Sequence, residues 1–201
     1  APTVPPPAAK PVMTVKADQI TSQALAGNLL GDPATRPFYV LLPPSYDTGD
    51  KRYPVVYVLH PYLGSELEMV GQFKTALEKL LRDGAVQEMI FVFPNGDNRL
   101  HGSMYLSSPT IGDYETYLTQ ELVDLVDSKY RTLPQQESRG VTGCSMGGHG
   151  AIHLALKCPQ VYSVAAPVSA TYDPWRGPAL AQAEEFFHGD PADLDAAANL
   201  D

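Results

Sequence analysis

The amino-acid sequence predicts a doubly wound α/β fold in which most strands of the sheet run parallel. Apolar runs at 53–59 and 89–94 have the length and the β-branched content of strands that are covered on both faces. Helical stripes of apolar residues separate these runs, and a third strand at 139–142 leads through a short turn into an apolar helix at 151–157. Strands that alternate with helices in this way form a parallel sheet with right-handed crossovers.

The first elements are two strands, and a crossover helix follows the third strand at 53–59. Strands are expected at 13–17 and 37–43, and we place this opening pair at an edge of the sheet. Ser65 and Glu68 have the spacing of a capping box, which begins a helix, and Gly84 ends it. The apolar stripe of this helix comprises Val70, Phe73, Leu77, Leu80 and Leu81.

The remaining elements continue the alternation. A polar loop is expected at 95–108, and a strand at 162–170. Beyond that strand the sequence is polar, with one short helix expected. Between loop and strand, the apolar face of a second helix comprises Leu118, Leu122, Leu125 and Val126.

The segment around Ser145 carries the strongest chemical signal. Gly143-Cys144-Ser145-Met146-Gly147 places a serine between glycines where a strand turns sharply into a helix. Such a turn forces strained dihedral angles on its central residue, and the two glycines remove side chains that would collide across it. The hydroxyl is then exposed at the positive end of the following helix, where NH groups can stabilise negative charge. We interpret this segment as a nucleophile elbow.

Composition and charge exclude several classes of function. With 201 residues, 44% of them hydrophobic, the chain can bury the core of one domain, which we place at 13–201. The formal charge of −9 argues against nucleic acid or an anionic membrane surface as a partner. No apolar run approaches the roughly 20 residues of a membrane-spanning helix. Cys144 and Cys158 lie at opposite ends of one predicted helix, so we expect two buried free thiols.

A proline-rich leader is expected at 1–12. It contains no initiator methionine, which is typical of a mature chain whose export signal has been removed. We therefore expect a secreted or periplasmic protein; a trimmed chain is the alternative.

Several ordered motifs resemble the esterase branch of the α/β-hydrolases, which includes esterase D, tributyrin esterase, feruloyl esterases and mycolyltransferases. The resemblance runs from about residue 38 to the C-terminus. It rests on segments 39–46, 53–60, 105–109, 130–132 and 143–151.

The resemblance implies roles for individual residues. Ser145 is the acyl-accepting nucleophile, and the oxyanion hole combines the NH of Met146 with an NH from the loop after the third strand. By position that second donor is Tyr62, since Pro61 has no NH. The segment that begins at Tyr105 is expected to line the acyl pocket.

Two further pocket candidates are histidines. His60 follows the third predicted strand, and His149 lies one turn after the nucleophile, with His153 one turn beyond. His60 is expected in a loop or behind the pocket wall rather than as the catalytic base. His149 and His153 share a helix face at metal-ligand spacing, but they lack the glutamate of H-E-x-x-H and an obvious third ligand. We therefore predict a pocket wall or packing, and no metal.

The acid and the histidine of a catalytic triad are not evident. In this fold they follow the serine in the order acid, then histidine. The chain ends 56 residues after Ser145, so we expect a C-terminally incomplete hydrolase domain whose last strands lie outside it. The alternative is an internal triad with Asp173 and His188.

The resulting prediction is a serine carboxylesterase that acts through an acyl-enzyme on Ser145 and needs no cofactor. Its substrate would be a small-molecule or carbohydrate-linked ester with a short acyl, acetyl or feruloyl group. Two alternatives stay open: an acyltransferase of the mycolyltransferase type, and a non-catalytic binding module that retains the fold.

Overall fold

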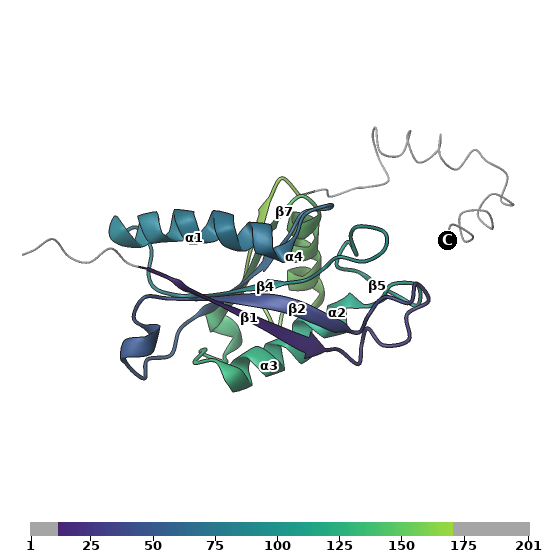
Figure 1. The fold of residues 1–201 in the computed structure, drawn as a ribbon, viewed down its shortest axis with the longest axis horizontal. Coiled ribbons are helices and arrows are strands. Elements are labelled where there is room, and N and C mark those ends of the chain that lie inside the picture. Colours follow the sequence, from purple (N-terminus) through teal and green to yellow (C-terminus); the bar gives the residue numbers. More distant parts are fainter. Residues whose placement is uncertain (1–11, 171–201) are drawn as a thin grey trace, which may run out of the picture. The chain divides into compact units, whose positions relative to one another are not determined.

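A computed structural model of the protein describes residues 12–170, which form a six-stranded mixed sheet with helices on both faces (Figure 1). The spatial order of the strands is β1-β2-β4-β3-β7-β8. Their bounds are β1 (Thr14–Thr21), β2 (Thr35–Leu42), β3 (Val55–Leu59), β4 (Ile90–Pro94), β7 (Arg139–Cys144) and β8 (Val164–Val168). A separate hairpin consists of β5 (Ser107–Ser108) and β6 (Gly112–Asp113). The helices are α1 (Glu66–Arg82), α2 (Tyr114–Thr116), α3 (Leu122–Lys129) and α4 (Met146–Lys157), and the π-helical turn η2 (Tyr117–Glu121) joins α2 to α3.

Four strands of the sheet are parallel, which confirms the predicted mostly parallel architecture. β4, β3, β7 and β8 run in the same direction, whereas β2 is antiparallel to both of its neighbours. All five residues of β4 are buried, as expected for a strand covered on both faces. Of the two opening strands, only β1 lies at an edge of the described sheet, and its side chains are mostly exposed. The prediction that both opening strands lie at the edge is therefore wrong for β2, which pairs with β4.

Two hydrophobic layers sandwich the sheet. Helix α1 packs on one face, where Val70 and Leu77 join Leu41, Val58 and Phe91 in a buried cluster. The capping box of α1 is present, with Ser65 and Glu68 as its partners. On the other face, α3 and α4 bury Leu122, Val126 and Leu154 in a second cluster. Figure 1 shows α1 and α3 on opposite sides of the sheet.

Residues with strained backbone dihedral angles cluster at the carboxyl ends of the parallel strands, along one side of the sheet. β3, β4, β7 and β8 all end at this edge, because parallel strands share the direction of their carboxyl ends. Each non-glycine residue with a positive φ in the described chain lies on a connection that follows one of these ends. They are Leu63, His101, Met104, Tyr105, Ser145 and Ser169. Such conformations cost free energy and concentrate at functional sites.

Two glycines allow the strand-to-helix turn between β7 and α4. A Cβ atom on Gly147 would lie 2.1 Å from the carbonyl oxygen of Leu59, at the end of β3. A Cβ atom on Gly143 would lie 2.5 Å from the carbonyl group of Gly147. The first turn of α4 therefore lies directly against the backbone of the neighbouring strand.

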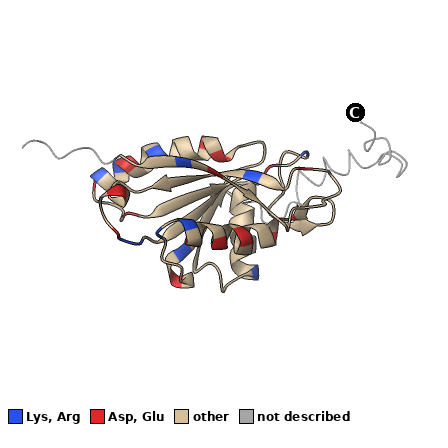
Figure 2. Cartoon of the chain, turned by 60° about the horizontal axis from the view of Figure 1, so that its bottom comes forward, with Lys and Arg blue, Asp and Glu red and all other residues tan. Residues whose placement is uncertain are grey.

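The surface of the described chain mixes charges of both signs. Blue (Lys, Arg) and red (Asp, Glu) positions both occur along the helices in Figure 2. Within residues 12–170, no helix combines the length and the apolar character needed to cross a membrane. Both cysteines are free thiols, as predicted, although Cys144 and Cys158 are half-buried rather than buried.

The contact between Gly147 and Leu59 predicts a large difference between two glycine substitutions. Gly147→Ala is expected to destabilise the protein by about 3 kcal/mol, because the new methyl group meets backbone that cannot move aside. Gly71→Ala, on an open face of α1, is expected to stabilise it by about 0.5–1 kcal/mol through helix propensity. Urea unfolding of both variants measures the two free energies. Equal effects would show that the close approach is not a constraint.

Candidate active site

Ser145 occupies the tip of the turn between β7 and α4. Its φ of 54° and ψ of −115° are strained for a residue with a side chain. Its backbone is held on both sides: the NH donates to the carbonyl oxygen of Val168 at 3.0 Å, and the carbonyl accepts from the NH of His149 at 2.9 Å. The hydroxyl group makes no hydrogen bond with any other residue in 12–170. A half-buried, unengaged hydroxyl on a rigid backbone is the arrangement that a nucleophile requires.

The two backbone NH groups predicted to form the oxyanion hole have no hydrogen-bond acceptor within residues 12–170. Met146 is the first residue of α4, and neither its NH nor that of Tyr62 donates a hydrogen bond to another described residue. Gly102 lies against the side chains of both residues. A Cβ atom at this position would be 2.5 Å from the sulfur of Met146 and 2.7 Å from the ring of Tyr62. The Tyr62 ring is 49% exposed. This placement is compatible with the predicted oxyanion hole.

His60 is buried beneath the site rather than exposed in a pocket. Its side chain has no exposed surface, and Nε2 accepts a hydrogen bond from the NH of Gly96 at 2.9 Å. The ring proton must therefore reside on Nδ1, which donates to the carbonyl oxygen of Pro61 at 2.9 Å. Because both ring nitrogens make hydrogen bonds, the imidazole joins the loop after β3 to the loop after β4. Of the two positions expected for the pocket candidate His60, in a loop or behind the pocket wall, the structure shows an interior ring with no exposed surface.

Tyr105 is also an interior residue. Its ring has no exposed surface and lies between two glycines: Cβ atoms on Gly96 and Gly150 would be 2.3 Å and 2.5 Å from ring atoms. Its hydroxyl donates to the carbonyl oxygen of His60 at 2.9 Å. Burial raises the pKa of Tyr105 well above its usual value, so the phenol stays protonated. The prediction that this side chain lines the acyl pocket is wrong, because its loop turns the ring inward.

His149 and His153 form a parallel pair on one face of α4. Their ring centroids are 6.0 Å apart and their planes differ by 6°. Both side chains are half-buried. His153 makes a 2.6 Å contact with the carboxylate of Glu115, which lies on α2. Of the two predicted pocket histidines, His149 is the one that lies on α4, one turn after Ser145.

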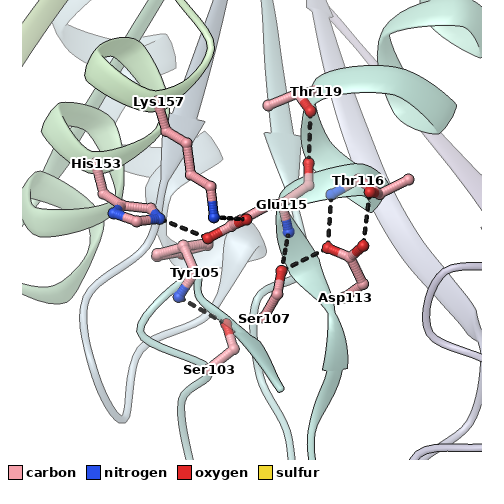
Figure 3. A network of polar contacts seen from close by, with 9 residues as sticks. All are labelled: Ser103, Tyr105, Ser107, Asp113, Glu115, Thr116, Thr119, His153 and Lys157. Atoms are coloured by element: carbon pink, nitrogen blue, oxygen red, sulfur yellow. Dashed lines mark hydrogen bonds and ion pairs between the residues drawn. The ribbon is translucent and has the colours of Figure 1, made fainter. Parts of the chain in front are cut away.

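Glu115 is the centre of a polar network that the sequence patterns did not reveal (Figure 3). One carboxylate oxygen contacts His153 and the other contacts Lys157 at 2.5 Å. Burial by itself raises the pKa of Glu115, but the hydrogen bonds from Lys157 and His153 outweigh it and lower the pKa overall. A usable signal is present in retrospect: Ser145, His149, His153 and Lys157 recur at every fourth position.

Neither residue of the alternative triad can be placed. Asp173 and His188 lie outside the described residues, as do the leader residues before Val12 and the polar segment after Ala170. Among residues 12–170, no group of three or more histidine, cysteine or acidic side chains is arranged to hold a metal ion.

Comparison with known proteins links the chain to esterases. A family model described as "Putative esterase" matches residues 33–199. The chain is 33% identical over 123 residues to an esterase of Mycobacterium tuberculosis, with 59% of this chain and 25% of that protein covered. It is 28% identical over 114 residues to an endo-1,4-beta-xylanase/feruloyl esterase of Xylanibacter ruminicola, with 56% of this chain and 16% of that protein covered. A solved ferulic acid esterase matches with a TM-score of 0.66 and 28% identity, over 76% of this chain and 58% of that chain. The chain thus spans a quarter or less of the length of these curated relatives.

The network around α2 predicts a specific loss of stability in acid. Burial raises the pKa of Asp113, but hydrogen bonds from Ser107 and Thr116 outweigh it and lower the pKa below its usual 3.8. A carboxyl whose pKa is lowered by folding contributes stability above its unfolded pKa and loses that contribution as pH falls through the folded pKa. The free energy of unfolding should therefore decline below about pH 4, and the decline should be shallower in Asp113→Asn. Urea titrations across this range measure both slopes. Identical slopes would mean that Asp113 ionises equally in both states.

Proposed function

The chain belongs to the esterase family, and from that membership we propose that its full natural protein is a serine carboxylesterase with Ser145 as the nucleophile. The α/β-hydrolase fold is confirmed by the structural comparison. The observation that carries the proposal is the strained turn at Ser145: within residues 12–170, neither its hydroxyl nor the NH groups of Met146 and Tyr62 make a hydrogen bond. A purely structural turn gains nothing from such strain.

In the proposed reaction, the Ser145 oxygen attacks the carbonyl carbon of the ester and forms a C–O bond. The carbonyl oxygen becomes an oxyanion, which the NH groups of Met146 and Tyr62 stabilise. The oxyanion then re-forms the carbonyl group as the C–O bond to the leaving alcohol breaks, and the alcohol leaves with the proton that the general base took from the serine hydroxyl. Water hydrolyses the resulting acyl-enzyme to the carboxylic acid and regenerates the serine.

We propose that the general base and its orienting acid come from residues outside 12–170. His60 is unsuited to that role, because both of its ring nitrogens are engaged in the interior. His153 is engaged with Glu115. Asp173 and His188 stay candidates in the part of the chain that is not described.

An apolar acyl or aryl group is the substrate that the rim of the site favours. Tyr62, Leu63 and Leu100 are 49%, 71% and 53% exposed, on the two loops that follow β3 and β4. The loops are joined by a hydrogen bond from the NH of Leu63 to the carbonyl oxygen of His101 at 3.1 Å. Exposed apolar side chains on these loops provide a surface for an aromatic acid such as the ferulic acid bound by a structurally similar esterase.

Substitution of the nucleophile tests the proposal. Ser145→Ala in the full natural protein should lower the turnover of a short-chain aryl ester by about 10⁴-fold or more, because the proposed acyl-enzyme forms on the hydroxyl that this change removes. Ser163→Ala is the matched control, since this exposed serine only bonds to nearby carbonyl groups. Intact-mass measurement after exposure to a fluorophosphonate should show one adduct, mapped to Ser145.

The alternatives give different results. Turnover that survives Ser145→Ala would refute the assignment of the nucleophile. Product formation that requires an added sugar acceptor would identify an acyltransferase. A full natural protein that is neither labelled nor active would identify a binding module.

A further inference from the structure

Helix α4 presents a stripe of polar side chains that begins at the nucleophile. Ser145, His149, His153 and Lys157 are spaced four residues apart, so they lie along one side of the helix. Side chains on a helix lean toward its N-terminus, which directs each member of the stripe toward the one before it. The parallel rings of His149 and His153 are consistent with this direction.

The Glu115 side chain contacts two residues of this stripe. Its carboxylate contacts His153 at 2.6 Å through one oxygen and Lys157 at 2.5 Å through the other, and the side chain is only 13% exposed. The two donors lie one turn apart on α4, so the contact resists both rotation and sliding of the helix. His153 donates through Nε2–H whether the ring is neutral or protonated, so the contact does not require a charged histidine.

The backbone of Glu115 is itself held firmly. Its NH donates to the hydroxyl of Ser107 at 3.2 Å, and its carbonyl oxygen accepts from the hydroxyl of Thr119 at 2.7 Å. Asp113 caps the same turn: it accepts from the NH and the hydroxyl of Thr116 at 2.9 Å and 2.6 Å, and from Ser107 at 2.5 Å. Figure 3 shows these contacts converging beside α4. Glu115 therefore transmits to α4 the position of the β5–β6 hairpin.

A second contact joins the same loop to α4. The ring of Tyr105, two residues before Ser107, packs against Gly150 so closely that a Cβ atom there would be 2.5 Å from it. The segment from Tyr105 to Glu115 thus touches α4 through packing at Gly150, a hydrogen bond to His153 and an ion pair with Lys157. Because Ser145 is the N-cap of this helix, any displacement of α4 moves the hydroxyl and the Met146 NH together, relative to Tyr62.

We propose that Glu115 is a positioning residue for the nucleophile: it fixes α4 and the His153–His149 pair, and so holds Ser145 and the Met146 NH in register with the Tyr62 NH. The inference rests on the proposed function, since it assigns Glu115 to the same site. Misplacement of a reacting group by about 1 Å can cost about 10²-fold in rate, so a modest shift of α4 would be measurable.

The test compares two glutamates in the full natural protein. Glu115→Gln keeps the size of the side chain but removes its charge and one acceptor. Glu78→Gln is the matched control, because Glu78 also pairs with a lysine, Lys74, and accepts a backbone NH, from Met13. Burial raises the pKa of Glu78, but the hydrogen bonds from Lys74 and Met13 outweigh it and lower the pKa overall, as at Glu115. Glu78 differs in its place, on α1 at the opposite face of the sheet. The measurements are the rate of Ser145 labelling by a fluorophosphonate, kcat and KM for an aryl ester, and the thermal midpoint.

Glu115→Gln is expected to lower the labelling rate and kcat by about tenfold with KM nearly unchanged, while Glu78→Gln leaves all three unchanged. Similar thermal midpoints in the two variants would separate positioning from general stability. His153→Leu should reproduce the loss, and His153→Gln, which retains an NH donor, should largely restore the rate. This pair also provides the test if Glu115→Gln does not fold.

Wild-type rates in both Glu115→Gln and His153→Leu would overturn the inference and leave the proposed function standing. An equal loss in Glu78→Gln would also overturn it, because the effect would then be one of stability. An unlabelled wild-type protein would instead refute the proposed function, and the role of Glu115 with it.

Discussion

The site depends on one close approach of two backbones, that of Gly147 in α4 to the carbonyl group of Leu59 at the end of β3. This contact sets the first turn of the helix against the neighbouring strand, and the loop that leaves that strand carries Tyr62. The amides of Tyr62 and Met146 come from segments more than 80 residues apart in sequence, yet both residues contact Gly102. The sheet provides the rigid base, because β3 and β7 are paired along the whole of β3. The relative position of the proposed nucleophile and oxyanion hole is therefore set by contacts between backbone atoms.

Features encoded by neighbouring residues were predictable from the sequence. The glycines around Ser145 specify the turn, the apolar runs specify the buried strands, and Ser65 with Glu68 specifies the start of α1. Each of these signals acts over a few residues and depends on backbone sterics or hydrogen bonds that few tertiary contacts can override. The π-helical turn η2 was not predicted, because its apolar spacing does not differ enough from that of an α-helix.

Features that depend on distant partners were not predictable. His60 bonds to Gly96, 36 residues away, and Tyr105 bonds to His60, 45 residues away. Glu115 meets His153 across 38 residues. A polar or aromatic residue at the end of a strand is compatible with a pocket and with an interior brace, and only the path of the intervening loops decides between them. The prediction for β2 was wrong for the same reason, because β3 and α1 separate β2 in sequence from its partner β4.

The strained residues at the carboxyl edge of the sheet have a consequence for the heat resistance of this protein. Leu63, His101 and Met104 adopt a left-handed conformation that favours glycine, at a cost of about 1 kcal/mol each. Replacement by glycine would relieve that strain but would loosen the loops around the nucleophile. Thermostability is therefore better sought in α1, which holds none of these positive-φ residues and packs on the face of the sheet opposite α4. Substitutions that raise stability are thus expected to be compatible with the candidate site in α1 and to disturb it in the loops around Ser145.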